Sequence, residues 1–327
     1  MTDPALETVI SPDVEKALFS AVIPKNHAYR KLNRVINFTK LTKPLRSLYS
    51  HLGQHGIPIK KGFKALLIQF WEDLSDREME SAVRENMAIR WFVGFRLTEK
   101  TPDYSYFSKL RKRIKPTKIA EIFNTINKDL HSKGLFGNVF TFVDASSIIA
   151  KTSLWEERDK AIADGKEKLN NAVVGNYAAD KDARWGAKSK SKIWFGYKRH
   201  TAVDMKFGLI TKTTVTPANI PDFRVLRHIC PEDSMVFMDK LFDVASADKI
   251  LRENGCHPAT IRKKNNPDKN CDLDRWRSQV RMPFESIFSK LPKRTRYRGL
   301  LKVMFQNYLE SVIYNLKIAI SAPQIAT

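Results

Sequence analysis

The spacing of apolar residues along the chain changes near Gly137. Upstream of this residue, apolar positions recur every three or four residues, which predicts amphipathic helices. The clearest example is the segment 116–134, whose apolar face consists of Ile119, Ile122, Phe123, Ile126 and Leu130. Downstream, short runs of apolar, β-branched and aromatic residues predict strands that alternate with helices. We therefore predict two domains, an all-helical one over residues 1–133 and an α/β one over residues 134–327.

Two local signals mark helix ends in the N-terminal domain. Ser75 and Glu78 have the spacing of a capping box, which predicts that a helix begins there and runs to about residue 95. Gly134 follows the helix predicted over residues 116–133 and can end it, because glycine adopts the left-handed conformation at little cost.

The α/β domain opens with "NVFTFVDASS" at residues 138–147, a predicted buried strand that ends near Asp144. The segments that follow predict a hairpin over 197–218, a helix over 221–229, a strand over 234–239, a helix over 244–254, a strand over 257–262, and helices from about Asp274 to the end. This order indicates an α/β fold in which helices flank a mixed sheet. The polar segment at about 148–195 interrupts it and predicts an insertion after the first strand.

Charge narrows the choice of partner. The 327 residues include 57 lysines and arginines against 35 aspartates and glutamates, a net charge of +22. Between Arg262 and Lys302 there are 13 basic and four acidic residues, and residues 24–48 hold seven basic residues and no acid. A solvated face is one explanation, but clusters of one sign favour nucleic acid. We expect no membrane partner, since the apolar runs are far shorter than the roughly 20 residues of a membrane span, and we expect a cytoplasmic, nucleoid-associated protein.

Two aspartates stand at predicted strand ends, Asp144 after "FTFV" and Asp239 after "MVFM". Each alone can be a helix cap or a turn residue. Together they are a candidate metal site, because open α/β sheets bind ligands beyond the carboxyl ends of their strands. Phosphodiester chemistry at neutral pH requires charge neutralisation and an activated nucleophile, which two Mg²⁺ ions can supply through carboxylate ligands; Mn²⁺ can substitute.

A third carboxylate is expected from the C-terminal part of the domain. After residue 273 the acidic residues are Asp274, Glu285 and Glu310. We assign Asp274 to a basic loop and Glu310 to the solvent side of the closing helix, which leaves Glu285. If Pro283 begins a helix, Glu285 lies in the first turn, where the helix dipole stabilises an ionised carboxylate. The alternative is a solvated glutamate that balances nearby arginines.

Several segments resemble one known family. They are, in chain order, "AIRWFVGFRLTEKTPDYSYFSKLRKRI" (88–114), "TFVDAS", "DARWGAKSK", "GYKRHTAVD", "GLITKTTVTPANIPD", "MDKLF" and "RYRGL". Over about residues 60–320 the chain resembles the DDE transposases of bacterial insertion sequences, in particular the insertion-sequence-five family. The resemblance implies a ribonuclease-H-like catalytic domain with Asp144 and Asp239 as catalytic carboxylates. It also implies Mg²⁺, recognition of terminal inverted repeats in double-stranded DNA, and at least a homodimer on the paired ends.

The third position departs from the family pattern. Many close relatives have a glutamate two residues before a proline–phenylalanine pair, and Arg281 stands there in this chain. Arg281 and Glu285 fit the arginine-to-glutamate spacing of a wider signature of these transposases. Glu285 is therefore predicted as the third catalytic residue and metal ligand. The alternative is that this copy has lost its glutamate and is inactive.

The functional hypothesis is a transposase that cuts at the element ends and joins the 3′ ends to target DNA by two-metal phosphoryl transfer. The rivals are a metal-dependent nuclease without strand transfer and an inactive, DNA-binding remnant. Asp182 and His200 match recurrent family positions and are possible accessory residues. The predicted DNA-binding residues are Arg111, Lys112, Arg113, Lys240, Arg281, Lys290, Lys293, Arg294, Arg296 and Arg298.

Overall fold

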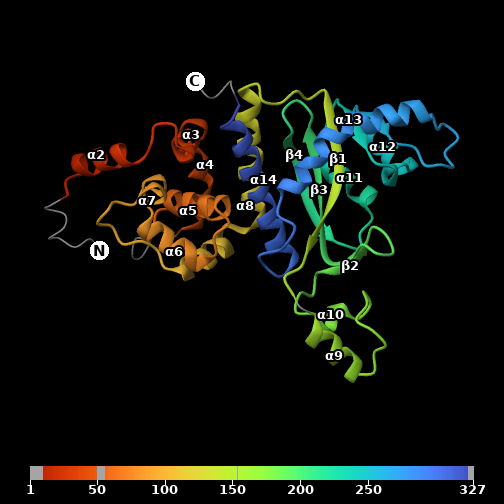
Figure 1. The fold of residues 1–327 in the computed structure, drawn as a ribbon, viewed down its shortest axis with the longest axis horizontal. Coiled ribbons are helices and arrows are strands. Elements are labelled where there is room, and N and C mark those ends of the chain that lie inside the picture. The colour runs from red at the N-terminus through yellow and green to blue at the C-terminus, as the bar shows by residue number, and fades with distance from the viewer. Residues whose placement is uncertain (1–9, 50–55, 153, 323–327) are drawn as a thin grey trace. The chain divides into compact units, whose positions relative to one another are not determined.

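The structure is a computed structural model that describes residues 10–49, 56–152 and 154–322. The chain divides into two compact units (Figure 1). The first consists of Met1–Asp129 and Leu316–Thr327, and the second of Leu130–Asn315.

The first unit is helical throughout its described residues. Its elements are α2 (Pro12–Val22), α3 (Ala28–Val35), α4 (Phe38–Thr42), the 3-10 helix η1 (Lys43–Leu48), α5 (Ile59–Trp71), α6 (Asp76–Glu85), α7 (Met87–Val93) and most of α8 (Tyr104–Ser132). The predicted capping box is confirmed, since Ser75 and Glu78 each accept the other's backbone N–H. The single helix predicted to residue 95 is wrong. Asn86 ends α6 in an extended conformation, and its side chain caps α7.

Helix α8 contains the apolar face predicted from residue 119 onward, and this face is buried. A break precedes it at Lys115, which has φ 56° and ψ 156° because a proline follows and disfavours the helical conformation of the preceding residue. Gly134 lies just past the end of α8 with φ 73°, as predicted. No helix within the described ranges is long and apolar enough to cross a membrane.

The second unit is built on a six-stranded sheet of order β2-β3-β1-β5-β6, with β4 paired to β3. The strands are β1 (Phe140–Ile149), β2 (Arg184–Ala187), β3 (Ile193–Asp204), β4 (Leu209–Pro217), β5 (Met235–Met238) and β6 (His257–Thr260). Strands β1, β3 and β4 are antiparallel neighbours, whereas β1, β5 and β6 run parallel. This is the predicted ribonuclease-H-like mixed sheet.

Helices cover both faces of the sheet. On one face, Val143 and Met238 pack with residues of α11 (Leu226–Ile229) and α12 (Ala245–Glu253). On the other face, Phe142 and Phe237 contact aromatic residues of α13 (Cys271–Lys290), and β3 bonds to α14 (Leu300–Ala319). Figure 1 shows α13 crossing in front of the strands. The alternation of strand side chains therefore separates a mainly apolar face, which also holds His200, from one that carries the Arg199–Glu310 pair.

Three segments differ from the prediction. Strand β1 continues to Ile149, because β3 pairs with it along its whole length. The helix predicted over 221–229 is a 3-10 turn, η2 (Asp222–Val225), followed by the four-residue α11. The insertion folds as α9 (Trp155–Ala163) and α10 (Val174–Tyr177), which extend beyond the sheet in Figure 1, and then as β2, which joins the sheet edge beside β3.

Glu310 is buried, so its predicted position on the solvent side of α14 is wrong. It pairs with Arg199 of β3, and both side chains are almost inaccessible to solvent. Arg199 also donates to Asn307, and Gln306 donates to Glu310. A charge on a central strand requires an opposite charge on the covering helix, because an unpaired buried arginine is very costly. This pair fixes α14 against the sheet.

We predict that Glu310→Ala lowers the free energy of unfolding by about 3–5 kcal/mol, since it leaves Arg199 buried and uncompensated. Urea denaturation followed by circular dichroism measures this change. Asp159→Ala, which removes the exposed partner of Arg158, is the matched control and should cost less than about 1 kcal/mol. Equal losses in the two variants would contradict a structural role for the buried pair.

Candidate active site

The parallel pairing of β1 with β5 brings two aspartates to one place. Phe142 is registered with Phe237, and Asp144 and Asp239 each follow two residues later. Because strand side chains alternate, both aspartates share the face of the two phenylalanines. The sequence predicted Asp144 at the end of its strand. In the structure it lies within β1, at the point where β1 continues beyond its parallel partner β5.

Each aspartate accepts one backbone hydrogen bond. Asp144 Oδ1 accepts the N–H of Ala145 at 2.7 Å, and Asp239 Oδ1 accepts that of Lys240 at 2.6 Å. Asp239 thereby caps the short 3-10 helix η3 (Lys240–Phe242). The other carboxylate oxygen of each residue makes no hydrogen bond with a described residue. These two oxygens are the ones available to a cation.

The charge of Asp144 is disfavoured by its surroundings. Burial raises the pKa of the Asp144 carboxyl to about 6, and the nearby charge of Asp239 raises it as well. The N–H of Ala145 and the positive charges of Arg281 and Lys188 act in the opposite direction. Lys188 Nζ lies 3.4 Å from the carbonyl oxygen of Ala145. Sequence reasoning missed Lys188, whose only signal was its place within "DARWGAKSK".

The helix that carries the third predicted ligand begins earlier than expected. Asn270 caps α13 by accepting the N–H groups of Asp272 and Leu273, and the helix then continues through Pro283. A helix start at Pro283 is therefore wrong. Glu285 lies in the C-terminal half of α13, where the positive end of the helix dipole does not support its charge.

Arg281, rather than Glu285, lies on the buried face of α13. Its side chain is 6% exposed and its guanidinium lies 5.2 Å from the ring centroid of Phe142. Nη1 is 3.9 Å from Oδ1 of Asp239, and Nη2 is 3.6 Å from Oε1 of Glu285. The Glu285 side chain is 56% exposed. Arg281 therefore links the aspartate pair to Glu285.

Two carboxylates, those of Asp144 and Asp239, are brought together here. Across the described residues, no group of three histidine, cysteine, aspartate or glutamate side chains is placed to hold a metal ion. Mg²⁺ is commonly held by one or two carboxylates with water and phosphate, so Asp144 and Asp239 suffice for one ion. The third carboxylate that a two-ion site requires is not gathered with them. Glu285 as a ligand stays a prediction.

Comparisons with known proteins identify the family of this chain. Residues 136–316 match the family described as "Transposase DDE domain", and residues 18–113 match the one described as "Transposase domain (DUF772)". The chain belongs to the transposase DDE domain family. Among solved structures, it matches a chain of "Cryo-EM structure of piggyBac transposase synaptic complex with hairpin DNA (SNHP)" at 10% identity and a TM-score of 0.40, covering 86% of this chain and 71% of that one.

In this transposase, buried acids form ion pairs with some basic residues of the segment from Arg262 to Lys302. Asp274 is not in a loop, as predicted, but in the first turn of α13, where it accepts hydrogen bonds from Lys269 and Arg277. Asp243 pairs with Arg262 at 2.8 Å. These basic side chains are neutralised within the protein, because a buried carboxylate needs a partner.

The other predicted DNA-binding residues fall into two groups. Arg111 makes two hydrogen bonds to Asp76, at 2.6 and 2.7 Å, and is a bracing residue of the helical unit. Arg296 is partly buried, and its N–H donates to Gln306. The exposed group consists of Lys112, Arg113, Lys240, Lys290, Lys293, Arg294 and Arg298.

The segment with Lys293 and Arg294 is fixed beside the end of β1. The N–H of Ile149 donates to the carbonyl of Lys293, and the N–H of Thr295 donates to the carbonyl of Ile149. These bonds extend the sheet by one bridge. They hold exposed basic side chains on the strand that carries Asp144.

The two possible accessory residues lie in different settings. Asp182 Oδ2 accepts the N–H of Leu300 at 2.8 Å, which places a carboxylate at the N-terminus of α14. His200 precedes Thr201, the partner of Asp144 in β3, so it faces the opposite side of the sheet. Its Nε2 is 2.8 Å from Thr216 Oγ1, and its Nδ1 is 3.9 Å from Asp222.

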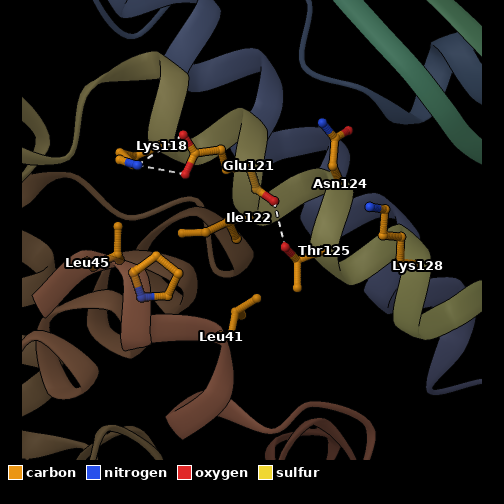
Figure 2. Close-up of a pocket in the computed structure, with 9 residues that line it drawn as sticks. Leu41, Leu45, Lys118, Glu121, Ile122, Asn124, Thr125 and Lys128 are labelled. Atoms are coloured by element: carbon orange, nitrogen blue, oxygen red, sulfur yellow. Dashed lines mark hydrogen bonds and ion pairs between the residues drawn. The ribbon is translucent and has the colours of Figure 1, made fainter.

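A pocket in the helical unit contains none of the predicted site residues (Figure 2). Its volume is about 360 Å³, and Figure 2 shows Lys118 paired with Glu121 at its rim. The apolar lining comes from Leu41, Leu45 and Ile122. Since its one acid is already paired with a lysine, the pocket provides no free carboxylate for metal chemistry.

We predict that His200 lowers the stability of the folded protein at acidic pH. Burial lowers the pKa of His200 to about 4, whereas an unfolded histidine titrates near 6.5. Unfolding then takes up a proton between these values, so stability is lost as pH falls from about 6.5 to 4. Urea denaturation measures the free energy of unfolding at pH 7 and at pH 5. The decrease in this free energy from pH 7 to pH 5 should be about 1–2 kcal/mol smaller in His200→Gln than in the wild type. His228→Gln, at an exposed histidine, should retain the full wild-type loss.

Proposed function

We propose that this transposase cuts DNA at the ends of a mobile element and joins the freed 3′ ends to target DNA, with Asp144 and Asp239 as its essential carboxylates. The observation that carries the proposal is that both aspartates lie on one face of the sheet, just beyond the last paired residues of β1 and β5. Each also keeps an oxygen without a hydrogen bond to a described residue.

The charges around the pair suit phosphodiester chemistry. A divalent cation held by Asp144 and Asp239, Mg²⁺ or Mn²⁺, supplies positive charge for the phosphate oxygens during in-line displacement. Lys188 and Arg281 favour the ionised form of Asp144 against the effect of burial. The pair is thus kept ready to bind a cation despite its partly buried position.

The proposed partner is double-stranded DNA, both the terminal inverted repeats and the target. Support comes from the net charge of +22 and from the exposed basic residues after α13. Arg294 is bridged to Ile149, five residues beyond Asp144 on one strand, which corresponds to about 17 Å. DNA bound there through phosphates would reach the aspartates. We also propose that the helical unit contributes to DNA binding, that the protein acts as a homodimer or larger assembly, and that it works in the cytoplasm with the nucleoid.

A second candidate function is that of a DNA-binding remnant without chemistry. The observation in its favour is Arg281, a buried cation beside the aspartate pair. Supercoiled plasmid carrying the element ends, incubated with protein and Mg²⁺, distinguishes the two. Retained binding without nicking would establish the remnant, and cleavage without joined product would establish a plain nuclease.

We predict that Asp144→Asn and Asp239→Asn each lower end cleavage on the order of 10³-fold, because each removes a negative charge that holds the cation. Cleavage of a labelled end fragment measures the rate. Affinity for the same fragment without metal should change little. Asp272→Asn, a fully solvated acid on α13, is the control. Near wild-type cleavage by either site variant would refute the assignment.

Glu285→Ala tests the third predicted ligand in the same assay. If Glu285 is a ligand, the loss should be on the order of 10³-fold, as for the two aspartates; a loss of about 10-fold or less would exclude it from the metal site. A loss equal to that of Asp144→Asn would instead identify Glu285 as the third ligand.

We predict that the exposed basic residues bind phosphates. The variant Arg294→Gln with Arg298→Gln should weaken DNA binding at every sequence, and the slope of log affinity against log salt should fall by about two. Fluorescence anisotropy over a salt series measures both effects. Lys249→Gln, an exposed lysine of α12 on the opposite face, is the control. An unchanged slope would exclude these arginines from the interface.

A further inference from the structure

Lys188 is the first residue of the turn that joins β2 to β3. The turn, residues 188–192, reads KSKSK. The N–H of Lys188 donates to the carbonyl of Lys192 at 2.9 Å. The N–H of Lys192 in turn donates to the hydroxyl of Ser189 at 3.1 Å. These bonds fix the backbone from which the Lys188 side chain projects.

The Lys188 side chain reaches the strand that carries Asp144. Its Nζ lies 3.4 Å from the carbonyl oxygen of Ala145, the residue whose N–H donates to Asp144. Ala145 lies beyond Phe142, the last residue of β1 that pairs with β5. Burial raises the pKa of the Asp144 carboxyl, and the charge of Lys188 is close enough to oppose this effect. The ammonium group thus lies beside the aspartate pair.

Lys188 has no acidic partner that would neutralise its charge. No carboxylate of the described residues forms an ion pair with it, and its contact with Ala145 is to a neutral carbonyl. A charge-assisted hydrogen bond from an ammonium group is shorter, about 2.7–2.9 Å. By contrast, Arg262 is paired with the buried Asp243 at 2.8 Å. Because Lys188 is exposed and its contact with Ala145 is weak, little stability is lost when its ammonium group turns to a phosphate oxygen.

Cleavage of a DNA strand spreads negative charge over the scissile phosphate. A water oxygen bonds to phosphorus as the bond from phosphorus to the 3′ oxygen breaks; the water releases one proton, and the departing 3′ oxygen takes one up. In the transition state the charge is spread over the non-bridging oxygens. An ammonium group that is already in place and stays protonated throughout stabilises this charge. Lys188 meets this requirement, because hydrogen bonds of the turn fix its backbone.

We propose that Lys188 is a further catalytic residue, whose ammonium group binds a non-bridging oxygen of the scissile phosphate beside Asp144. This rests on the proposed function, in which Asp144 and Asp239 act on a DNA phosphate. Lys190 and Lys192, the other lysines of the turn, are also exposed. Among the described residues, neither of their side chains bonds to β1. The proposal therefore separates one lysine of the turn from its two neighbours.

The test is cleavage of a labelled end fragment by saturating full-length protein with Mg²⁺, with affinity for the fragment measured separately by fluorescence anisotropy. Lys188→Gln should lower the cleavage rate on the order of 100-fold, because it removes a charge that stabilises the transition state, and should change the affinity by less than about threefold. Lys190→Gln removes the same charge from the same turn and should keep the wild-type rate. Equal rates in the two variants, or a loss that lies wholly in affinity, would overturn the role of Lys188.

Two further measurements separate phosphate binding from an effect exerted through Asp144. Lys188→Arg keeps the charge and should retain at least about a tenth of the wild-type rate; a loss equal to that of Lys188→Gln would contradict the proposal. Raising the pH from about 7 to about 8.5 ionises Asp144 without help from Lys188, so the deficit of Lys188→Gln should stay on the order of 100-fold. Recovery of the rate at the higher pH would show that Lys188 acts only on Asp144, and the proposal would be wrong.

The behaviour of the wild type separates this inference from the proposed function. A wild type that cleaves the fragment no faster than Lys188→Gln, at a measurable rate, contradicts only the role of Lys188. A wild type that binds the fragment without cleaving it contradicts the proposed function, and the catalytic role of Lys188 falls with it.

Discussion

The parallel pairing of β1 with β5 is the constraint on which the site depends. Three registered residue pairs, ending at Phe142 and Phe237, align two segments almost one hundred residues apart. A slip of one residue would move one aspartate to the opposite face, because strand side chains alternate. The apolar side chains of the other face pack under α11 and α12, and this packing opposes such a slip. The geometry of the aspartates is thus held by a core in which they take no part.

The charged face is organised by two helices in different ways. On α14, Glu310 neutralises Arg199 within a nearly inaccessible, hydrogen-bonded cluster, which serves stability. On α13, Arg281 meets the aspartates at longer distances and without hydrogen bonds, so its charge is only partly compensated. The charge of Arg281 instead favours the ionised form of Asp144, whose pKa burial raises. The same sheet face therefore holds both a rigid support and a responsive site.

The insertion and the segment after α13 extend the site beyond the two strands. Lys188, at the end of the insertion, reaches the backbone beside Asp144, and the segment at 293–295 bonds to the end of β1. Both contribute basic side chains near a cluster of acids, where they reduce the repulsion of a phosphate backbone. Buried acids such as Asp243 and Asp274 neutralise other basic residues. Net charge alone therefore overstates the surface available to DNA.

The sequence by itself determined the fold class, the capping box at Ser75 and the hairpin formed by β3 and β4, because these depend on local periodicity and turn chemistry. It could not determine the burial of Glu310, the start of α13 or the burial of Arg281. Those features depend on which face of a helix meets the sheet, and Asn270 sets that phase by capping α13 well before Pro283. Tertiary packing thus decided that the Arg281 side chain is buried near Asp239 while the Glu285 side chain is mainly exposed.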